Sequence, residues 1–236
     1  MALGKISAAV AALALLTGAP SIAGAQAPAK AAKAQNWAAK VVETKNGWRV
    51  GNPDAPHKLV EYLSLNCGHC ATLADNKGPL FEKLVASGRM SLEYRPMTIF
   101  PWDTSATTLA RCVAPAKRMA FTHDYMKNQD KVRAGLQELL KDRAKVEQIQ
   151  AALESDKPFF LKSIAEAGGM YAIAARHGVD KATADACMNK PDAIFWADSR
   201  SAAASAKGVK GTPTLYLNDD PLDESGLFAL ETTVSK

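Results

Sequence analysis

The segment HKLVEYLSLNCGHC constrains this chain more than any other feature, because it places two cysteines where a strand gives way to a helix. Residues 57–65 are rich in Leu, Val and Tyr, which is typical of a buried strand. From Gly68 onward, apolar residues recur at helical spacing, and Gly88 is a natural end for that helix. Cys67 and Cys70 are therefore expected at a strand-to-helix junction.

A cysteine pair at this junction has the chemistry of a redox pair. The free backbone N–H groups and the positive dipole end of a helix N-terminus favour a thiolate at Cys67. His69 lies between the cysteines and can add a cationic or hydrogen-bonding partner. Cys70, one turn further on, should be more buried. We expect Cys67 to be the attacking sulfur and Cys70 the resolving one.

Other uses of a cysteine pair fit the sequence less well. A zinc site needs about four ligands, but Cys112 and Cys187 are isolated and the other histidines lack ligand spacing. Haem attachment needs a histidine directly after the second cysteine, and that position is Ala71. A static structural disulfide remains an alternative. No metal and no organic cofactor is expected.

The remaining elements describe an α/β domain with an insertion. Asn46-Gly47 predicts a hairpin, MSLEYRPMTIF predicts a strand that ends at or lies on an edge near Pro96, and TPTLYLND predicts a late strand before a small helix. Gly78-Pro79 should kink or divide the helix that follows the cysteines. Between the last two strands the patterns predict only helices, at 105–113, 116–127, 131–142, 146–155, 159–177, 182–189 and 193–206. This order indicates one α/β domain interrupted by helices.

The N-terminus has the three regions of a signal peptide. Lys5 precedes an apolar run over residues 6–16, which is shorter than the roughly 20 residues that span a bilayer. Small residues then offer cleavage sites near residues 25–27. We therefore expect a signal peptide over 1–27, a linker over 28–36, and export to a bacterial periplasm, where thiols meet an oxidising environment.

Three separated motifs, NPDAPHKLVEY, EYLSLNCGHC and GVKGTPTLYLND, together resemble the DsbA-type thiol:disulfide oxidoreductases. The resemblance runs from about Trp37 to the end of the chain. It implies a thioredoxin fold with an inserted all-helical domain, in which 37–104 and 207–236 form the thioredoxin-like domain and 105–206 the insertion.

The same resemblance implies roles for further residues. Thr212-Pro213 would be a cis-proline loop facing the cysteines, with the Thr212 backbone pairing with substrate in β fashion. Glu61 would lie beneath the cysteines and assist proton transfer for the resolving thiol, and a strand-edge carboxylate facing water is the alternative. The dipeptide Gly68-His69 departs from the proline-histidine of many DsbA proteins and matches protein disulfide isomerases, which leaves the oxidising strength open.

Cys112 and Cys187 both fall within the predicted helical block. Because an exported protein with an even number of cysteines commonly pairs them, we expect a second, structural disulfide between these two residues. Two buried free thiols are the alternative.

The sequence thus predicts a periplasmic thiol:disulfide oxidoreductase that introduces disulfides into reduced exported proteins. The resemblance implies reoxidation by a DsbB-like membrane quinone oxidoreductase. An isomerase or reductase, a chaperone-like binding module and a metallochaperone are the alternatives. The formal charge of +5 is dispersed and forms no basic stripe with interleaved aromatics, so nucleic-acid binding is not expected.

Overall fold

The computed structural model describes residues 35–236, so the predicted signal peptide and nearly all of the predicted linker lie outside the described residues. Within that range the strands form one mixed sheet in the order β1-β2-β4-β3-β5-β6, in which only β3 and β4 run parallel. The strands are β1 Val41–Glu43, β2 Trp48–Gly51, β3 His57–Leu63, β4 Met90–Pro96, β5 Thr214–Leu217 and β6 Asp220–Pro221.

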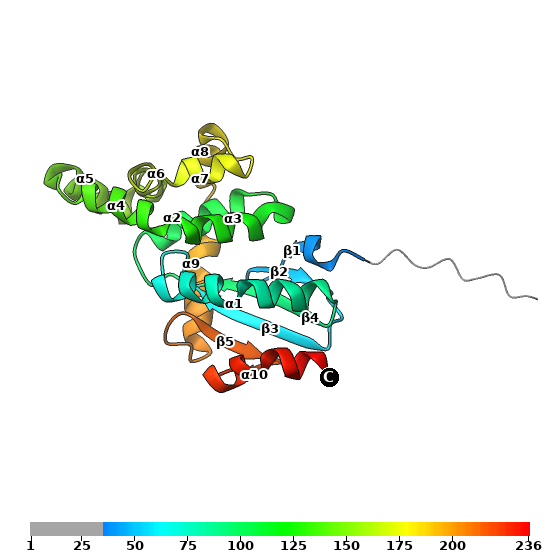
Figure 1. The fold of residues 1–236 in the computed structure, drawn as a ribbon. Helices are drawn as coiled ribbons and strands as arrows, with labels where there is room; N and C mark the ends of the chain where they lie inside the picture. Colours follow the sequence, from blue (N-terminus) through cyan, green and yellow to red (C-terminus); the bar gives the residue numbers. More distant parts are fainter. Residues whose placement is uncertain (1–34) are drawn as a thin grey trace, which may run out of the picture. The chain divides into compact units, whose positions relative to one another are not determined.

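Helices flank the sheet and form a separate layer beyond it (Figure 1). Those belonging to the sheet domain are a short 3-10 turn at Trp37–Ala39, α1 Gly68–Ala86 and α10 Glu224–Ser235. The insertion contains α2 Asp103–Cys112, α3 Pro115–Lys127, α4 Gln129–Leu139, α5 Arg143–Ser155, α6 Lys157–Ala167, α7 Met170–Arg176, α8 Lys181–Met188 and α9 Pro191–Ala206. This confirms the predicted order of strands and helices.

The predicted hairpin at Asn46-Gly47 is confirmed by the antiparallel pairing of β1 with β2. The side chain of Thr44 accepts hydrogen bonds from the backbone N–H groups of Asn46 and Gly47. A Cβ atom at Gly47 would lie 1.8 Å from the carbonyl oxygen of Tyr94 in β4. Only glycine therefore fits at this position of the turn.

Two predictions about helix continuity are corrected. Of the expected kink or division at Gly78-Pro79, the division does not occur: α1 runs unbroken through residue 86, and Phe81, Leu84 and Val85 beyond the proline are buried in the core. The single helix expected over 159–177 is two helices, because Gly169 takes a left-handed conformation with φ +64° that ends one and starts the next.

The two faces of the sheet carry different groups. Along β3, Leu59, Glu61 and Leu63 alternate with Val60 and Tyr62. The first face packs with α1 in the main core, whereas Val60 and Tyr62 join a smaller cluster with Ala204 of α9. Glu61 is therefore directed to the same side of the sheet as the helix that begins at the cysteines.

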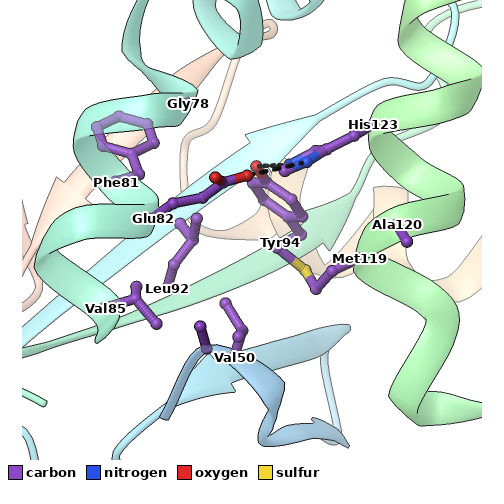
Figure 2. A pocket seen from close by; sticks show the side chains of 11 residues that line it. Val50, Gly78, Phe81, Glu82, Val85, Leu92, Tyr94, Met119, Ala120 and His123 are labelled. Carbon is purple, nitrogen blue, oxygen red and sulfur yellow. Dashed lines mark hydrogen bonds and ion pairs between the residues drawn. The ribbon is translucent and has the colours of Figure 1, made fainter. Parts of the chain in front are cut away.

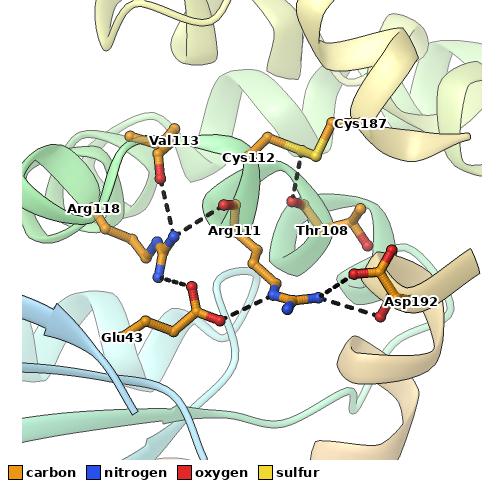
Figure 3. Close-up of a disulfide and its surroundings, with 8 residues drawn as sticks. All are labelled: Glu43, Thr108, Arg111, Cys112, Val113, Arg118, Cys187 and Asp192. Atoms are coloured by element: carbon orange, nitrogen blue, oxygen red, sulfur yellow. Dashed lines mark hydrogen bonds and ion pairs between the residues drawn. A yellow bond between two sulfur atoms is a disulfide. The ribbon is translucent and has the colours of Figure 1, made fainter. Parts of the chain in front are cut away.

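Covalent and ionic contacts tie the insertion together and to the sheet (Figure 3). Cys112 at the end of α2 and Cys187 on α8 form a disulfide. Arg118 of α3 is 2% exposed and donates to the carboxylate of Glu43 in β1 over 3.0 Å, and Arg111 of α2 donates to the same carboxylate over 3.2 Å. Glu43 thus anchors two insertion helices to the first strand.

Candidate active site

Cys67 and Cys70 lie where β3 leads into α1. Cys67 is the N-cap of α1, with extended backbone angles, and Cys70 is in the first turn. Both are free thiols, and their exposed fractions are 6% and 0%. The outer sulfur therefore faces the helix N-terminus while the inner sulfur lies in the core, which is the asymmetry that dithiol exchange requires.

The loop before β5 meets Cys67 across 145 residues of sequence. The Cys67 thiol donates to the Thr212 carbonyl oxygen over 3.3 Å. The Thr212–Pro213 peptide bond is cis. The Thr212 hydroxyl is buried and has no hydrogen-bond partner among the described residues, so it is free to donate to Cys67 once that sulfur is a thiolate. The structure thus brings Thr212 and the cis-proline Pro213 next to Cys67.

The two sulfurs have opposite acidities. A hydrogen bond from the Cys70 side chain contributes most to lowering the pKa of Cys67 to about 5; Thr212 and the backbone N–H groups of Cys70 and His69 lower it further, against the opposing effect of burial. The same bond to Cys67, then burial and the charge of Glu61, raise the pKa of Cys70 far above its ordinary value. At neutral pH the pair is therefore one thiolate stabilised by one thiol.

His69 contributes through its backbone. Its N–H is among the groups that stabilise the Cys67 thiolate, while its side chain is exposed to solvent. The expected effect of the helix N-terminus is therefore present in the backbone N–H groups of His69 and Cys70, and an added contribution from the imidazole of His69 stays a prediction.

Glu61 lies on β3, the strand between β4 and β5, on the face of the sheet that α1 covers. Its exposed fraction is 2%, so the alternative of an edge carboxylate facing water does not describe its position. Burial, and after it the charge of Cys67, raises its pKa to about 8. A carboxyl group with this pKa can both hold and release a proton near neutral pH.

A set of polar residues that the sequence did not reveal holds the loop before Cys67. The carboxylate of Asp103, 0% exposed, accepts from the Ser64 hydroxyl over 2.8 Å and from the Asn66 amide over 2.7 Å. It also accepts from the backbone N–H groups of Ile99 and Phe100, both over 2.9 Å. One buried carboxylate therefore connects the loops that follow β3 and β4.

Two further insertion helices reach the same loop. The Gln129 amide of α4 donates to the carbonyl oxygens of Leu65, over 2.7 Å, and Cys67, over 3.0 Å. The Tyr125 hydroxyl of α3 donates to the Asn66 side chain over 3.0 Å. A helix of the insertion thus hydrogen-bonds directly to the backbone of Cys67.

Across residues 35–236, no cluster of three or more His, Cys, Asp or Glu side chains is arranged to hold a metal ion. Within the same range, no helix combines the length and apolar character needed to cross a bilayer. The Cys112–Cys187 disulfide lies within the insertion and joins α2 to α8.

Comparison with known proteins gives the family. The family model described as Thioredoxin matches residues 43–233. A putative protein-disulfide oxidoreductase of Rickettsia bellii is 30% identical over 122 residues, which are 48% of this chain and 47% of that protein, so the match spans about half of the relative's length.

Solved structures show the same fold. A protein-disulfide isomerase from Novosphingobium aromaticivorans superposes with a TM-score of 0.68 at 22% identity, covering 80% of this chain and 97% of that one. Wolbachia pipientis α-DsbA1 superposes with a TM-score of 0.55 at 20% identity, covering 73% of this chain and 75% of that one.

The chain belongs to the thioredoxin family, and its fold is that of the DsbA-type members. The expected thioredoxin fold with an inserted all-helical domain is confirmed.

Proposed function

We propose that this protein is a thiol:disulfide oxidoreductase that introduces disulfides into exported proteins through Cys67 and Cys70. The observation that carries this proposal is the position of Cys67 at the N-terminus of α1 beside the buried Cys70 thiol, an arrangement that lowers the pKa of Cys67 to about 5. A stabilised thiolate favours the dithiol form, and this makes the disulfide form a good electron acceptor. The name of the Rickettsia relative agrees with this chemistry.

The reaction uses the two sulfurs in sequence. A substrate thiolate attacks Cys67 of the oxidised pair, the Cys67–Cys70 bond breaks, and Cys70 leaves with the electron pair and takes a proton from Glu61. A second substrate thiolate then attacks the substrate sulfur of the mixed disulfide and releases Cys67 as its stable anion. The substrate loses two electrons and the enzyme becomes the dithiol. The edge of the Thr212 backbone beside Cys67 would hold an extended substrate segment.

Location, partner and domain division are part of the same proposal. The predicted signal peptide supports a periplasmic location, where an oxidised pair can be maintained. Reduced exported proteins are the proposed substrates, and a DsbB-like membrane quinone oxidoreductase is the proposed source of oxidant. We propose that residues 37–104 and 207–236 form the thioredoxin-like domain and that 105–206 form the insertion that supports it; this boundary falls in the first turn of α2, whose other turns belong to the insertion.

A trapping experiment tests the proposal. Cys70→Ala, expressed in its native host, should accumulate covalent adducts through Cys67 that dithiothreitol releases, while Cys67→Ala should accumulate none. The oxidised wild type should also form disulfides in a reduced, unfolded test protein. Absence of adducts from Cys70→Ala would contradict the mechanism. Strong repair of scrambled disulfides with weak oxidation of reduced protein would move the function to isomerisation, and rescue of maturation by a Cys67→Ala/Cys70→Ala protein would indicate a chaperone.

A further inference from the structure

Glu61 must lose its own proton before its carboxylate can act as a base. Its side chain is 2% exposed, and its Oε1 atom has no hydrogen-bond partner among residues 35–236. With a pKa raised to about 8 by burial and by the charge of Cys67, it is protonated at pH 7. When the dithiol closes to a disulfide, that proton must reach solvent before Glu61 can accept the proton of Cys70. A route from the core to the surface is required.

Tyr94 is the first group on such a route. It is the register partner of Glu61 across the parallel strands β3 and β4, and partners in a parallel pair direct their side chains to the same face. That face is covered by α1, and Tyr94 packs in the same core as Cys70. Burial, followed by the charge of Glu61, raises the pKa of Tyr94, so its hydroxyl keeps its proton and can pass one on as it receives another.

His123 and Glu82 continue the route to the surface (Figure 2). The Tyr94 hydroxyl lies 3.2 Å from Nε2 of His123 on α3, and Nδ1 of the same ring lies 3.7 Å from Oε1 of Glu82 on α1. The exposed side-chain fractions are 25% for His123 and 68% for Glu82. The exposed fraction therefore rises from Tyr94, at 2%, through His123 to Glu82.

Two cavities give water access to this route. One, of about 270 Å³, is lined by Tyr94, His123 and Glu82 at its polar end and by apolar side chains such as Leu92 and Val85 elsewhere (Figure 2). A second, of about 200 Å³, is also lined by His123 and Glu82. His123 thus borders both cavities, where water can collect its proton.

We propose that Tyr94 and His123 form the path by which Glu61 exchanges its proton with solvent when Cys70 closes the disulfide, a role that rests on the proposed function. Both residues act through Glu61 and not on the sulfur atoms. The function of Glu82 is to receive protons at the outer end of the path.

Glu61 passes its proton to the Tyr94 oxygen through a bridging water, Tyr94 passes its own to Nε2 of His123, and Nδ1 releases one toward Glu82. The Glu61 carboxylate then takes the proton of Cys70. The Cys70 sulfur attacks the Cys67 sulfur of a mixed disulfide, and the electron pair of the broken bond leaves on the other thiol. The protein pair loses two electrons, and the disulfide that formed the adduct gains them.

The pH at which the path matters follows from the groups along it. Glu61 faces Cys67, Cys70 and Tyr94, and above pH 8 it is already ionised, so no proton has to leave first. Glu82, Lys127 and Asp75 act on His123, whose pKa is lowered chiefly by burial, so the ring is neutral at pH 7 and can accept a proton. Loss of the path should therefore slow the Cys70 step below pH 8 and have little effect above it.

Rapid acid quench of the reduced full-length protein with glutathione disulfide, read by mass spectrometry, separates adduct formation at Cys67 from closure by Cys70. General acid–base assistance contributes roughly 10²–10⁴-fold; since the path supplies only part of this, we expect Tyr94→Phe and His123→Ala to slow closure about tenfold at pH 6.5. Adduct formation should stay within about twofold of wild type, because the Cys67 thiolate needs no base. Imidazole, which fits the enlarged cavity, should restore closure in His123→Ala and not in Tyr94→Phe.

Met119→Ala is the matched control, since it enlarges the same cavity without removing a proton carrier. In this variant Cys70 should close the disulfide at the wild-type rate, and added imidazole should not change that rate. The path is overturned if both variants close as fast as wild type at pH 6.5, if their deficit persists unchanged at pH 9, or if both steps slow equally. Should Tyr94→Phe fail to fold, His123→Ala carries the test alone. A wild-type protein that forms no Cys67–Cys70 disulfide would contradict the proposed function instead.

Discussion

At the scale of single residues, the acidity of Cys67 sets how the redox potential of the pair responds to pH. Reduction of the disulfide takes up two electrons and, below the pKa of Cys67, two protons. Above that pKa only Cys70 takes up a proton, because Cys67 remains a thiolate. The number of protons taken up should therefore change at about pH 5, roughly 3.5 units below the pKa of an ordinary cysteine.

This change is measurable as a slope. The reduction potential should fall by about 59 mV per pH unit below pH 5 and by about 30 mV per pH unit above it. Equilibration with glutathione buffers from pH 4 to pH 8 gives the curve, and the 240 nm absorbance of the thiolate should titrate with the same midpoint. A break near pH 8.5 would show that the helix N-terminus does not stabilise Cys67.

At the scale of elements, α4 holds the loop that carries Cys67. The Gln129 amide satisfies two carbonyl groups in a buried position, so Gln129→Leu should leave both acceptors unpaired at a cost of about 1–3 kcal/mol. It should also raise the pKa of Cys67, since the backbone N–H groups around the sulfur lose their fixed orientation. Chemical denaturation and alkylation rates across a pH series measure the two effects.

Gln137→Leu is the comparison for that experiment, because Gln137 lies on the same helix with its side chain exposed. It should change neither quantity appreciably. If Gln129→Leu has the same stability and the same Cys67 pKa as Gln137→Leu, the contact between α4 and the loop has no influence on Cys67.

The same elements show what the sequence could and could not predict. The cysteine pair at the end of a strand was predictable because strand and helix have different apolar periods that meet at one point. The division between α6 and α7 was missed because the apolar pattern continues across Gly168-Gly169, and only the left-handed φ of Gly169 interrupts the helix.

Polar residues in the site were harder to foresee. Asp103, Gln129 and His123 lie in helices whose sequences look like ordinary amphipathic ones, and a polar residue there normally faces water. Each has a partner far away in the chain: Asn66 is 37 residues from Asp103, Leu65 is 64 from Gln129 and Tyr94 is 29 from His123. Such contacts have no local signal. Glu61 was recognisable only through the resemblance to a known family.

At the scale of the whole molecule, the Cys112–Cys187 disulfide closes a loop with a sequence separation of 75 residues inside the insertion. Restricting such a loop in the unfolded chain stabilises a protein by about 2–4 kcal/mol. Replacing both cysteines by alanine should therefore lower the melting temperature by roughly 5–15 °C. Differential scanning calorimetry measures this.

The variant should leave the Cys67 titration midpoint unchanged, because the bridge joins α2 to α8 and not the α1 N-terminus. A shift in that midpoint would indicate that the insertion transmits its own redox state to the site.

The sequence separation of 145 between Cys67 and Thr212 also has a consequence for biosynthesis. A ribosome makes the chain from its N-terminus, so both thiols leave the exit tunnel long before the segment that completes their surroundings. Until β5 is added beside β3, Cys67 lacks its contact with Thr212 and the part of its acidity that Thr212 supplies. Full activity would then arise only when translation nears its end, which protects the unfinished chain from attacking its neighbours.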